Sequence, residues 1–445
     1  MSIADTTVAP PQFGKVHTDP TKDFFVNMIT RDILLRDCIF DLLDNSIDGA
    51  RRQPAQDPAK PFQGYVIKLD FDETFFRIED NTGGILLSDA INYAFHFGRR
   101  PDSPDVSGGI GLYGIGMKRA IFKIGRLCKV ISHAADASFV VHMDVERWKL
   151  EESWDFEYED IKRETPLGTQ IEISELNSGV KEMLGDQVFK NELIKDIARD
   201  YAFFIQQGLE VQVGEDLVPS YRFQLRMSDQ VAPAVEQYED EGVQVRILAG
   251  LIDDLPDDIP DELKPGKVDR SGWFVICNNR VVLAADKTEE TIWGDGKFNI
   301  WHPQYNGFAG FVFFQADDQR KLPWTTTKRE LDPASPLYRR AIARMKAVTE
   351  IFLAYTNRRK ADITAAKVAE APRVQLDVSE LRVAQPAKLP TIVPMAPRPS
   401  MISIQYQRDK AEVEEIKRHF GNLGMSARDV GIRTFEYFRE VELGK

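Results

Sequence analysis

The strongest constraint in this 445-residue sequence is a pair of stretches, FDLLDNSIDGA from Phe40 to Ala50 and GGIGLYGIGMK from Gly108 to Lys118. In a helix over the first stretch, Asp41, Asn45 and Asp48 lie at i, i+4 and i+7, so these polar side chains share one face. The second stretch is a glycine loop that leads into a predicted helix, and backbone amides at a helix start bind phosphate. Together they predict a helix with a polar functional face beside an anion-binding loop.

Two further motifs follow in a fixed order. Two alternating strands, YVIKLDF and FFRIE, are predicted, and the second belongs to FRIEDNTGGI, from Phe76 to Ile85, which runs into Asp80 and a glycine turn. PLGTQIEI, from Pro166 to Ile173, is a strand with a Gly-Thr pair near its start. The order of the four motifs over about 130 residues resembles the GHKL superfamily of ATP-binding domains, which includes DNA gyrase, a heat-shock chaperone, MutL, Morc proteins and histidine kinases. The resemblance implies a Bergerat-type α/β sandwich that binds ATP.

The resemblance also assigns roles to the helix side chains. Asn45 corresponds to the residue that coordinates Mg²⁺, for which an amide oxygen is a suitable hard ligand. Asp41 corresponds to the acid that activates the attacking water, where hydrolysing members usually carry glutamate. The shorter side chain predicts slow turnover, because a misplaced catalytic group lowers the rate. Asp48 is expected to support the pocket, and Asp44, turned away from Asn45, is a weaker candidate for the base.

The strand motifs correspond to the adenine-binding part of the family site. Asp80 matches the aspartate that accepts a hydrogen bond from the exocyclic amine of adenine, and Thr169 matches the threonine that reaches the same base. Guanine presents a carbonyl at that position, so ATP is expected rather than GTP. Within the family box DxGxG, Gly84 retains the second glycine, whereas Thr82 replaces the first and leaves the turn geometry open.

The glycine loop matches the family lid box GxxGxG through its three glycines. Glycine is expected there because the backbone approaches the phosphates too closely for a side chain. Lys118 is expected to neutralise phosphate charge, with a solvated lysine as the alternative, and the loop from Arg99 is expected to form the lid. The predicted phosphate-binding residues are Gly111, Gly114, Ile115, Gly116, Met117 and Lys118.

A second domain is indicated downstream. SGWFVICNNRVV, from Ser271 to Val282, resembles the strand-turn-strand of the transducer domain in the gyrase, MutL and Morc branch. PWTTTKREL, from Pro323 to Leu331, resembles the loop from which a lysine of that branch reaches the γ-phosphate. The resemblance makes Lys328 the candidate, with a catalytic role in stabilising charge on the transferred group. The alternative is an ordinary loop lysine.

Periodicity and composition predict the remaining organisation. One helix is predicted from Thr21 to Arg52, another from Ile85 to Phe97, and a third from Ser335 to Arg358. From Met401 to Lys445, a short alternating strand with Ile402, Ile404 and Tyr406 on one side precedes two helices, the second capped by Ser426, and this order resembles a ribbon-helix-helix module. The predicted segments are an N-terminal arm (1–20), an ATP-binding domain (21–220), a smaller transducer-like α/β domain (221–360), a linker rich in Pro and Ala (361–400) and a C-terminal β-α-α module (401–445).

Composition limits the classes of partner. The net charge of −13 does not match a nucleic-acid-binding protein as a whole, so any DNA contact must be local. The C-terminal module carries eight basic and eight acidic residues, which places dimerisation ahead of DNA contact or docking onto the main body.

Cys38, Cys128 and Cys277 are expected to be reduced core residues. No signal-peptide pattern or membrane-length apolar run is present in the sequence, so a cytoplasmic protein with no membrane contact is expected.

The resemblance therefore implies a Mg²⁺-dependent switch that binds ATP, hydrolyses it slowly and closes as a homodimer. DNA, a protein client or a role in bacterial defence against phage is expected only by analogy. The alternative is a regulatory or scaffold protein that binds the nucleotide without hydrolysing it. A histidine kinase fits poorly, because only His17 precedes the site and no phosphoacceptor helix stands before it.

Overall fold

The computed structural model describes residues 18, 20–98, 100, 106–111, 114–163, 166–253, 270–296, 298–325, 328–371, 374–392 and 402–444. The chain divides into two compact units, Met1–Val393 and Pro394–Lys445. The first unit contains two large sheets, and the second contains a pair of helices. Apart from Thr18 and Pro20, the predicted N-terminal arm lies outside the described residues.

The first sheet has eight strands in the order β5-β4-β3-β6-β2-β1-β7-β8. Strands β1 and β7 pair in parallel, and the other neighbours are antiparallel. The predicted pair of alternating strands before Asp80 is confirmed as the β1–β2 hairpin. The strands are β1 (Val66–Phe71), β2 (Phe75–Asp80), β3 (Gly125–His133), β4 (Ser138–Asp144), β5 (Tyr158–Asp160), β6 (Gly168–Leu176), β7 (Glu210–Val213) and β8 (Asp216–Leu217).

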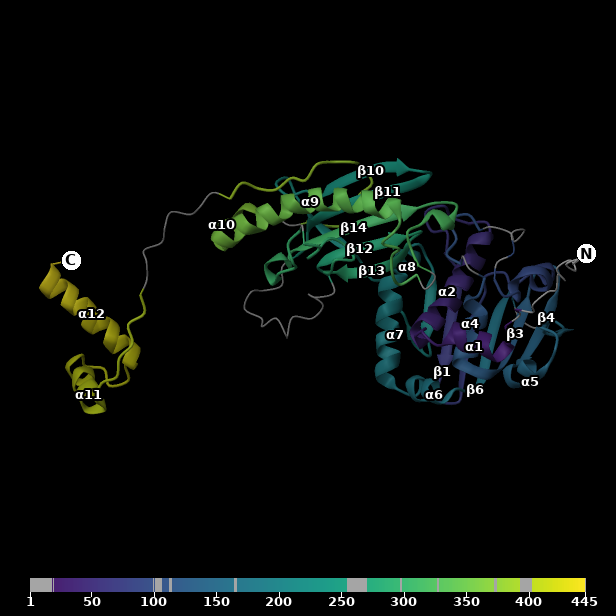
Figure 1. Ribbon diagram of the computed structural model, residues 1–445. Coiled ribbons are helices and arrows are strands. Elements are labelled where there is room, and N and C mark those ends of the chain that lie inside the picture. The colour runs from purple at the N-terminus through teal and green to yellow at the C-terminus, as the bar shows by residue number, and fades with distance from the viewer. Residues whose placement is uncertain are drawn as a thin grey trace, which may run out of the picture. The chain divides into compact units, whose positions relative to one another are not determined.

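Helices cover one face of this sheet, where α2 packs on α4 (Figure 1). The prediction of one helix from Thr21 to Arg52 is wrong, because Leu34 has extended backbone and Ile33 turns into the core between two helices. Helix α2 ends at Arg52, because the next residue, Gln53, precedes Pro54 and has the extended backbone that such a residue prefers. The helices are α1 (Lys22–Thr30), α2 (Leu35–Arg52), α3 (Leu87–Asp89), α4 (Gly116–Ile124), α5 (Val145–Leu150), α6 (Ser178–Leu184), α7 (Gln187–Asp200) and α8 (Ala202–Gln206).

The helix predicted from Ile85 to Phe97 is shorter and irregular. Three residues of α3 continue directly into a π-helical turn over Ala90–Ala94. Widened turns of this kind are frequent at functional sites, and Ala94 lies beside the cavity described below.

The second sheet follows the order β10-β11-β14-β12-β13 and carries the long helix α9 (Pro336–Ala361) against β11 and β14 (Figure 1). Its hairpin turn between β12 and β13 contains Asn278 and Asn279, with φ values of 47° and 70°. Two central residues with positive φ define the turn type that matches strand twist, and asparagine tolerates it. The strands are β10 (Ala234–Asp240), β11 (Val243–Leu251), β12 (Gly272–Cys277), β13 (Arg280–Asp286) and β14 (Phe308–Gln315).

The prediction of a linker over 361–400 is wrong for its described part. Helix α10 (Ile363–Ala369) follows α9, and β15 (Val374–Asp377) pairs antiparallel with β9 (Gln224–Met227). Glu370, which is 1% exposed, accepts hydrogen bonds from Arg226, Tyr355 and Arg359. Buried ion pairing and strand pairing therefore attach this segment to the first unit, and composition alone gave no sign of either.

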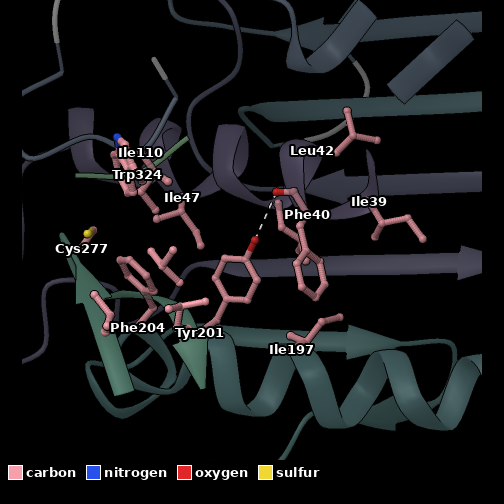
Figure 2. Close-up of a cluster of buried hydrophobic side chains, with 14 of the residues drawn as sticks. Ile39, Phe40, Leu42, Ile47, Ile110, Ile197, Tyr201, Phe204, Cys277 and Trp324 are labelled. Carbon is pink, nitrogen blue, oxygen red and sulfur yellow. Dashed lines mark hydrogen bonds between the residues drawn. The ribbon is translucent and has the colours of Figure 1, made fainter. Parts of the chain in front are cut away.

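The apolar face of α2 is buried between the first sheet and the second. Figure 2 shows Ile39 and Phe40 of α2 in one cluster with Tyr201, Cys277 and Trp324. The Tyr201 hydroxyl donates to the carbonyl of Phe40 at 3.1 Å. The cluster joins residues from both sheets, so α2 is held from two sides. The predicted burial of the cysteines is confirmed, and all three are free.

The second unit contains α11 (Lys410–His419) and α12 (Ala427–Leu443). The two predicted helices and the Ser426 cap are confirmed, since the Ser426 side chain accepts from the amide of Asp429. The strand predicted from Ile402 to Tyr406 is absent: these described residues are exposed and form no ladder. A strand needs a hydrogen-bonded neighbour, and the described part of this unit supplies none.

Candidate active site

The residues predicted to form the site converge on one cavity of about 300 Å³ in the first unit, which is within the size range of small-ligand pockets. A larger open groove of about 930 Å³ lies among α1, α6 and α7, and none of the predicted residues lines it. The thirteen predicted residues that line the smaller cavity are Asp41, Asn45, Asp48, Asp80, Gly84, Gly111, Gly114, Ile115, Gly116, Met117, Lys118, Thr169 and Lys328.

Helix α2 supplies the polar wall of the cavity. Asp41, Asp44 and Asp48 are 5%, 1% and 4% exposed, whereas Asn45 between them is exposed and open to the cavity. The predicted common face of Asp41, Asn45 and Asp48 is therefore present. Buried carboxylates require partners, and the carboxylates of Asp41, Asp44 and Asp48 each have them.

Asp48 holds the glycine loop against α2. Its carboxylate accepts hydrogen bonds from the amides of Ile110 at 2.8 Å and Gly111 at 2.6 Å. Burial raises the pKa of Asp48, and the two amides oppose that rise. A Cβ on Gly111 would lie 3.0 Å from Asp48 Oδ2 and 3.5 Å from Asn45 Oδ1. Glycine is needed at position 111 because the loop backbone lies close to side chains of α2. Glycine is expected from the sequence only because of the close approach to phosphates, and the sequence does not predict this contact with α2.

Asp80 also lines the cavity, and its carboxylate is fixed from several sides. Ser46 Oγ donates to one oxygen at 2.7 Å, and the Thr82 hydroxyl and amide donate to the other at 2.7 and 2.9 Å. The amide of Thr169 donates to that second oxygen at 3.2 Å. These contacts hold a hydrogen-bond acceptor in a fixed orientation beside the cavity.

The replacement of a family glycine by Thr82 is accommodated locally. Thr82 is 3% exposed, and its space depends on Gly49 of α2, where a Cβ would lie 2.5 Å from Thr82 Oγ1. Gly84 has φ +75°, and a Cβ there would lie 2.4 Å from the carbonyl oxygen of His133. The turn therefore keeps its required glycine and uses threonine as an additional partner of Asp80.

Residues 34–177 match the family described as histidine kinase-, DNA gyrase B-, and HSP90-like ATPase. This segment is a GHKL-type ATPase domain. The GHKL domain contains all four sequence motifs, whereas Lys328 lies outside the matched residues. No curated protein matches the chain. Within the described residues, none of the helices has both the length and the apolar character to cross a bilayer.

Lys118, in the first turn of α4, faces the interior of the GHKL domain. It is 2% exposed, and its ammonium donates to the carbonyls of Ala94 at 2.9 Å and Gly114 at 2.5 Å. Burial lowers the pKa of Lys118 to about 7. The alternative of a solvated lysine is wrong, and the cavity wall instead carries a cation whose charge changes near neutral pH.

Lys328 reaches the GHKL domain from the segment that follows β14. Its ammonium lies 2.7 Å from Asp44 Oδ2, while Tyr201 donates to Asp44 Oδ1 at 2.8 Å. Burial favours the neutral forms, yet Lys328 and Arg280 hold the pKa of Asp44 below its usual range, and Asp44 with Asp41 raises the pKa of Lys328. Lys328 also has φ +55°, which is uncommon for a residue with a side chain.

A buried network of ion pairs fixes the second sheet to the GHKL domain around this lysine. Arg280 of β13 lies 3.5 Å from Asp44 and 3.3 Å from Asp200. Arg329 pairs with Asp37 at 2.9 Å and with Asp200 at 2.8 Å. Three cations from the second sheet and its loops therefore contact acids on α2 and α7.

The glycine loop is also bound to the second sheet. Gly108 donates its amide to the carbonyl of Asp317 at 3.2 Å, and Asn278 donates to the carbonyl of Gly109 at 3.1 Å. Gln319 donates to the carbonyl of Gly111 at 3.0 Å. The glycine loop thus contacts the β12–β13 turn and the segment that follows β14. Positions 99, 101–105 and 112–113 of the expected lid lie outside the described residues.

Sequence reasoning missed Arg119, which also lines the cavity. Arg119 donates from Nε to Asp41 Oδ2 at 3.2 Å and from Nη2 to the same oxygen. Lys328 Nζ lies 3.7 Å from Asp41 Oδ1. Burial raises the pKa of Asp41, and the two cations oppose that rise. A basic residue on a short helix gives no sequence signal of a partner 78 positions away.

Proposed function

We propose that the chain is a Mg²⁺-dependent switch that binds and hydrolyses ATP, with the GHKL domain holding the nucleotide and Lys328 contacting its γ-phosphate. One observation carries the proposal: thirteen residues chosen from separate motifs line a single cavity. They come from α2, the ends of β2 and β6, the glycine loop, the start of α4 and position 328. Motifs that matched by chance would not converge in this way.

The cavity residues fit a nucleotide and its metal ion. Asn45 presents an amide side chain to the cavity, and Mg²⁺ uses few protein ligands because phosphates and water complete its shell. Within the described ranges, no group of three or more His, Cys, Asp or Glu residues could hold a metal by itself, so Asn45 would act together with the nucleotide. When bound, Mg²⁺ would neutralise phosphate charge.

The remaining contacts divide the nucleotide into a base and a phosphate end. Asp80 and Thr169 would bind the adenine edge, and Ile78 and Ile171, which are paired across β2 and β6, would contact its apolar face. The glycine loop, the start of α4 and Lys118 would bind the phosphates through amides and charge. These arguments favour ATP over GTP.

Asp41 would accept the proton of the attacking water. A second candidate function, nucleotide binding without turnover in a regulatory or scaffold protein, is favoured by the ion pair that occupies Asp41. The decisive experiment compares phosphate release with ATP binding by calorimetry in the wild type, Asn45→Ala and Asp41→Asn. Glu79→Gln, an exposed change beside Asp80, serves as the control.

Three outcomes of this comparison are informative. Turnover lost in Asp41→Asn with ATP still bound supports hydrolysis, whereas ATP binding with no turnover in the wild type supports the second candidate. Absence of ATP binding in the wild type would reject both. A separate titration with GTP tests the base, and equal affinity for GTP would reject the adenine assignment.

We further propose that the partner is a second copy of the chain, joined through the C-terminal module. In the described part of this module, Met425 and Val430 are the buried apolar side chains, whereas Ile432, Phe435 and Phe438 of α12 are exposed. A segment this short rarely forms a sufficient core alone. Its balanced charge would not oppose self-association.

Sedimentation of the full chain tests this interface. We expect Phe438→Glu to shift the protein towards monomer, and Arg428→Glu, an exposed polar control on the same helix, to leave the distribution unchanged. A monomeric wild type with and without a non-hydrolysable ATP analogue would contradict it. Capture of DNA or a protein client with that analogue would then test which class of macromolecule the switch acts on.

A further inference from the structure

The resting contacts of Asp41 differ from those of a free catalytic base. Arg119, 6% exposed, donates from two nitrogens to Oδ2, and Lys328 faces Oδ1. A cation therefore faces each carboxylate oxygen. A carboxylate in a charge-assisted hydrogen bond is a weaker proton acceptor, because the bond stabilises its ionised form.

Packing keeps Asp41 in this position. A Cβ on Gly116 would lie 3.0 Å from Asp41 Cγ, so the start of α4 encloses the carboxylate. Arg119 lies on the same helix, three residues after Gly116, and meets the carboxylate from the adjoining turn. Helix α4, which would bind phosphate at its start, thus also holds the candidate base.

We propose that Arg119 restrains Asp41, so that their ion pair must open before Asp41 accepts a proton from water. The inference rests on the proposed function, because it concerns the same site. In the step concerned, a water oxygen bonds to the γ-phosphorus, the bond from that phosphorus to ADP breaks, and Asp41 takes the water proton and later releases it to solvent. Arg119 acts through Asp41 and is a positioning residue that limits the rate.

Removal of the charge on Arg119 tests this restraint. In Arg119→Gln, the amide keeps a polar side chain while the ion pair is lost, and we expect kcat to rise about tenfold, as loss of one charge-assisted hydrogen bond to the base would allow. The KM for ATP should change less than kcat. In the Asp41→Asn background the same substitution should produce no rise, because the effect passes through Asp41. A structural role alone would not raise kcat.

Lys123→Gln is the matched control, since Lys123 lies one turn further along α4 and donates to the carbonyl of Thr30 at 2.9 Å, away from Asp41. Arg119→Lys keeps the positive charge with fewer hydrogen-bond donors, so its kcat should rise less than that of Arg119→Gln. If Arg119→Gln does not fold, the kcat of Arg119→Lys decides the question. Thermal unfolding and ADP calorimetry establish that each variant is folded.

A fall in kcat, or an unchanged kcat, in a folded variant that binds ADP would overturn the restraint. Calorimetry of the wild type separates this failure from a failure of the proposed function. If the wild type binds ATP and the variants show no gain, only the restraint is rejected. If the wild type does not bind ATP, the proposed function itself fails.

Discussion

Lys328 Nζ lies 2.7 Å from Asp44 Oδ2, although 284 positions of the chain separate the two residues. The contact places a cation from the second sheet on the helix that carries Asp41 and Asn45. Asp44 is held in turn by Tyr201 and lies near Arg280. A change in the cavity that alters the position of Lys328 would therefore reach the second sheet directly.

Lys328→Gln should lower ATP turnover about a hundredfold while ADP affinity stays within about twofold, because a charge that contacts the γ-phosphate has no partner in ADP. Phosphate release and ADP calorimetry measure the two effects. Arg329→Gln is the matched control, since Arg329 pairs with Asp37 and Asp200. It should lower stability and leave the turnover of the folded protein near that of the wild type. Equal losses of ATP and ADP binding in Lys328→Gln would contradict a γ-phosphate contact.

Asp80→Asn should weaken ATP binding by about 1–3 kcal/mol, because an amide in this position turns a donor towards the adenine amine and disturbs the contacts from Ser46 and Thr82. Competition between ATP and GTP measures the effect, and the preference for ATP should shrink. The neighbouring change Glu79→Gln should leave both affinities unchanged. Unaltered ATP binding in Asp80→Asn would show that this carboxylate does not contact the base.

Nucleotide affinity should depend on the charge of Lys118. With a pKa of about 7, Lys118 is mostly charged at pH 6 and mostly neutral at pH 8. The charged form attracts phosphate, so ADP affinity should fall about tenfold over that interval. Ionisation of the nucleotide's own phosphate over the same interval would by itself raise the affinity, and so it opposes the fall. Calorimetry between pH 6 and 8 should show the fall in the wild type and not in Lys118→Met, and the same pH dependence in both would exclude Lys118 as its source.

Arg280→Met should lower the free energy of unfolding by about 3–5 kcal/mol, because the change removes a partner of the buried acids Asp44 and Asp200. Urea unfolding followed by fluorescence measures the loss. Arg340→Met provides a comparison, since Arg340 pairs with Asp240 at the surface and exposed pairs contribute little. Similar losses in the two variants would show that the network between the sheets is not a main source of stability.

The sequence by itself located the residues that line the cavity of the GHKL domain. The common face of Asp41, Asn45 and Asp48 follows from the helical repeat, and the β1–β2 hairpin follows from alternation, because both patterns depend on neighbours in the chain. Residues 34–177, which match the ATPase family, contain the four local motifs. Local periodicity was insufficient where backbone direction changed, as at Ile33 and Leu34, where one predicted helix is two.

Tertiary structure decided which charged and polar groups meet. The pairing of Arg119 with Asp41, of Lys328 with Asp44 and of Asp317 with the glycine loop joins segments that no local pattern relates. The same reason explains why the prediction of a linker over 361–400 is wrong for its described part, since β15 acquires its partner β9 only when the chain folds back. The strand predicted at Ile402 has no such partner in the described residues. Spacing along the chain determines which side chains share a face of one element, whereas packing between elements determines which side chains that face contacts.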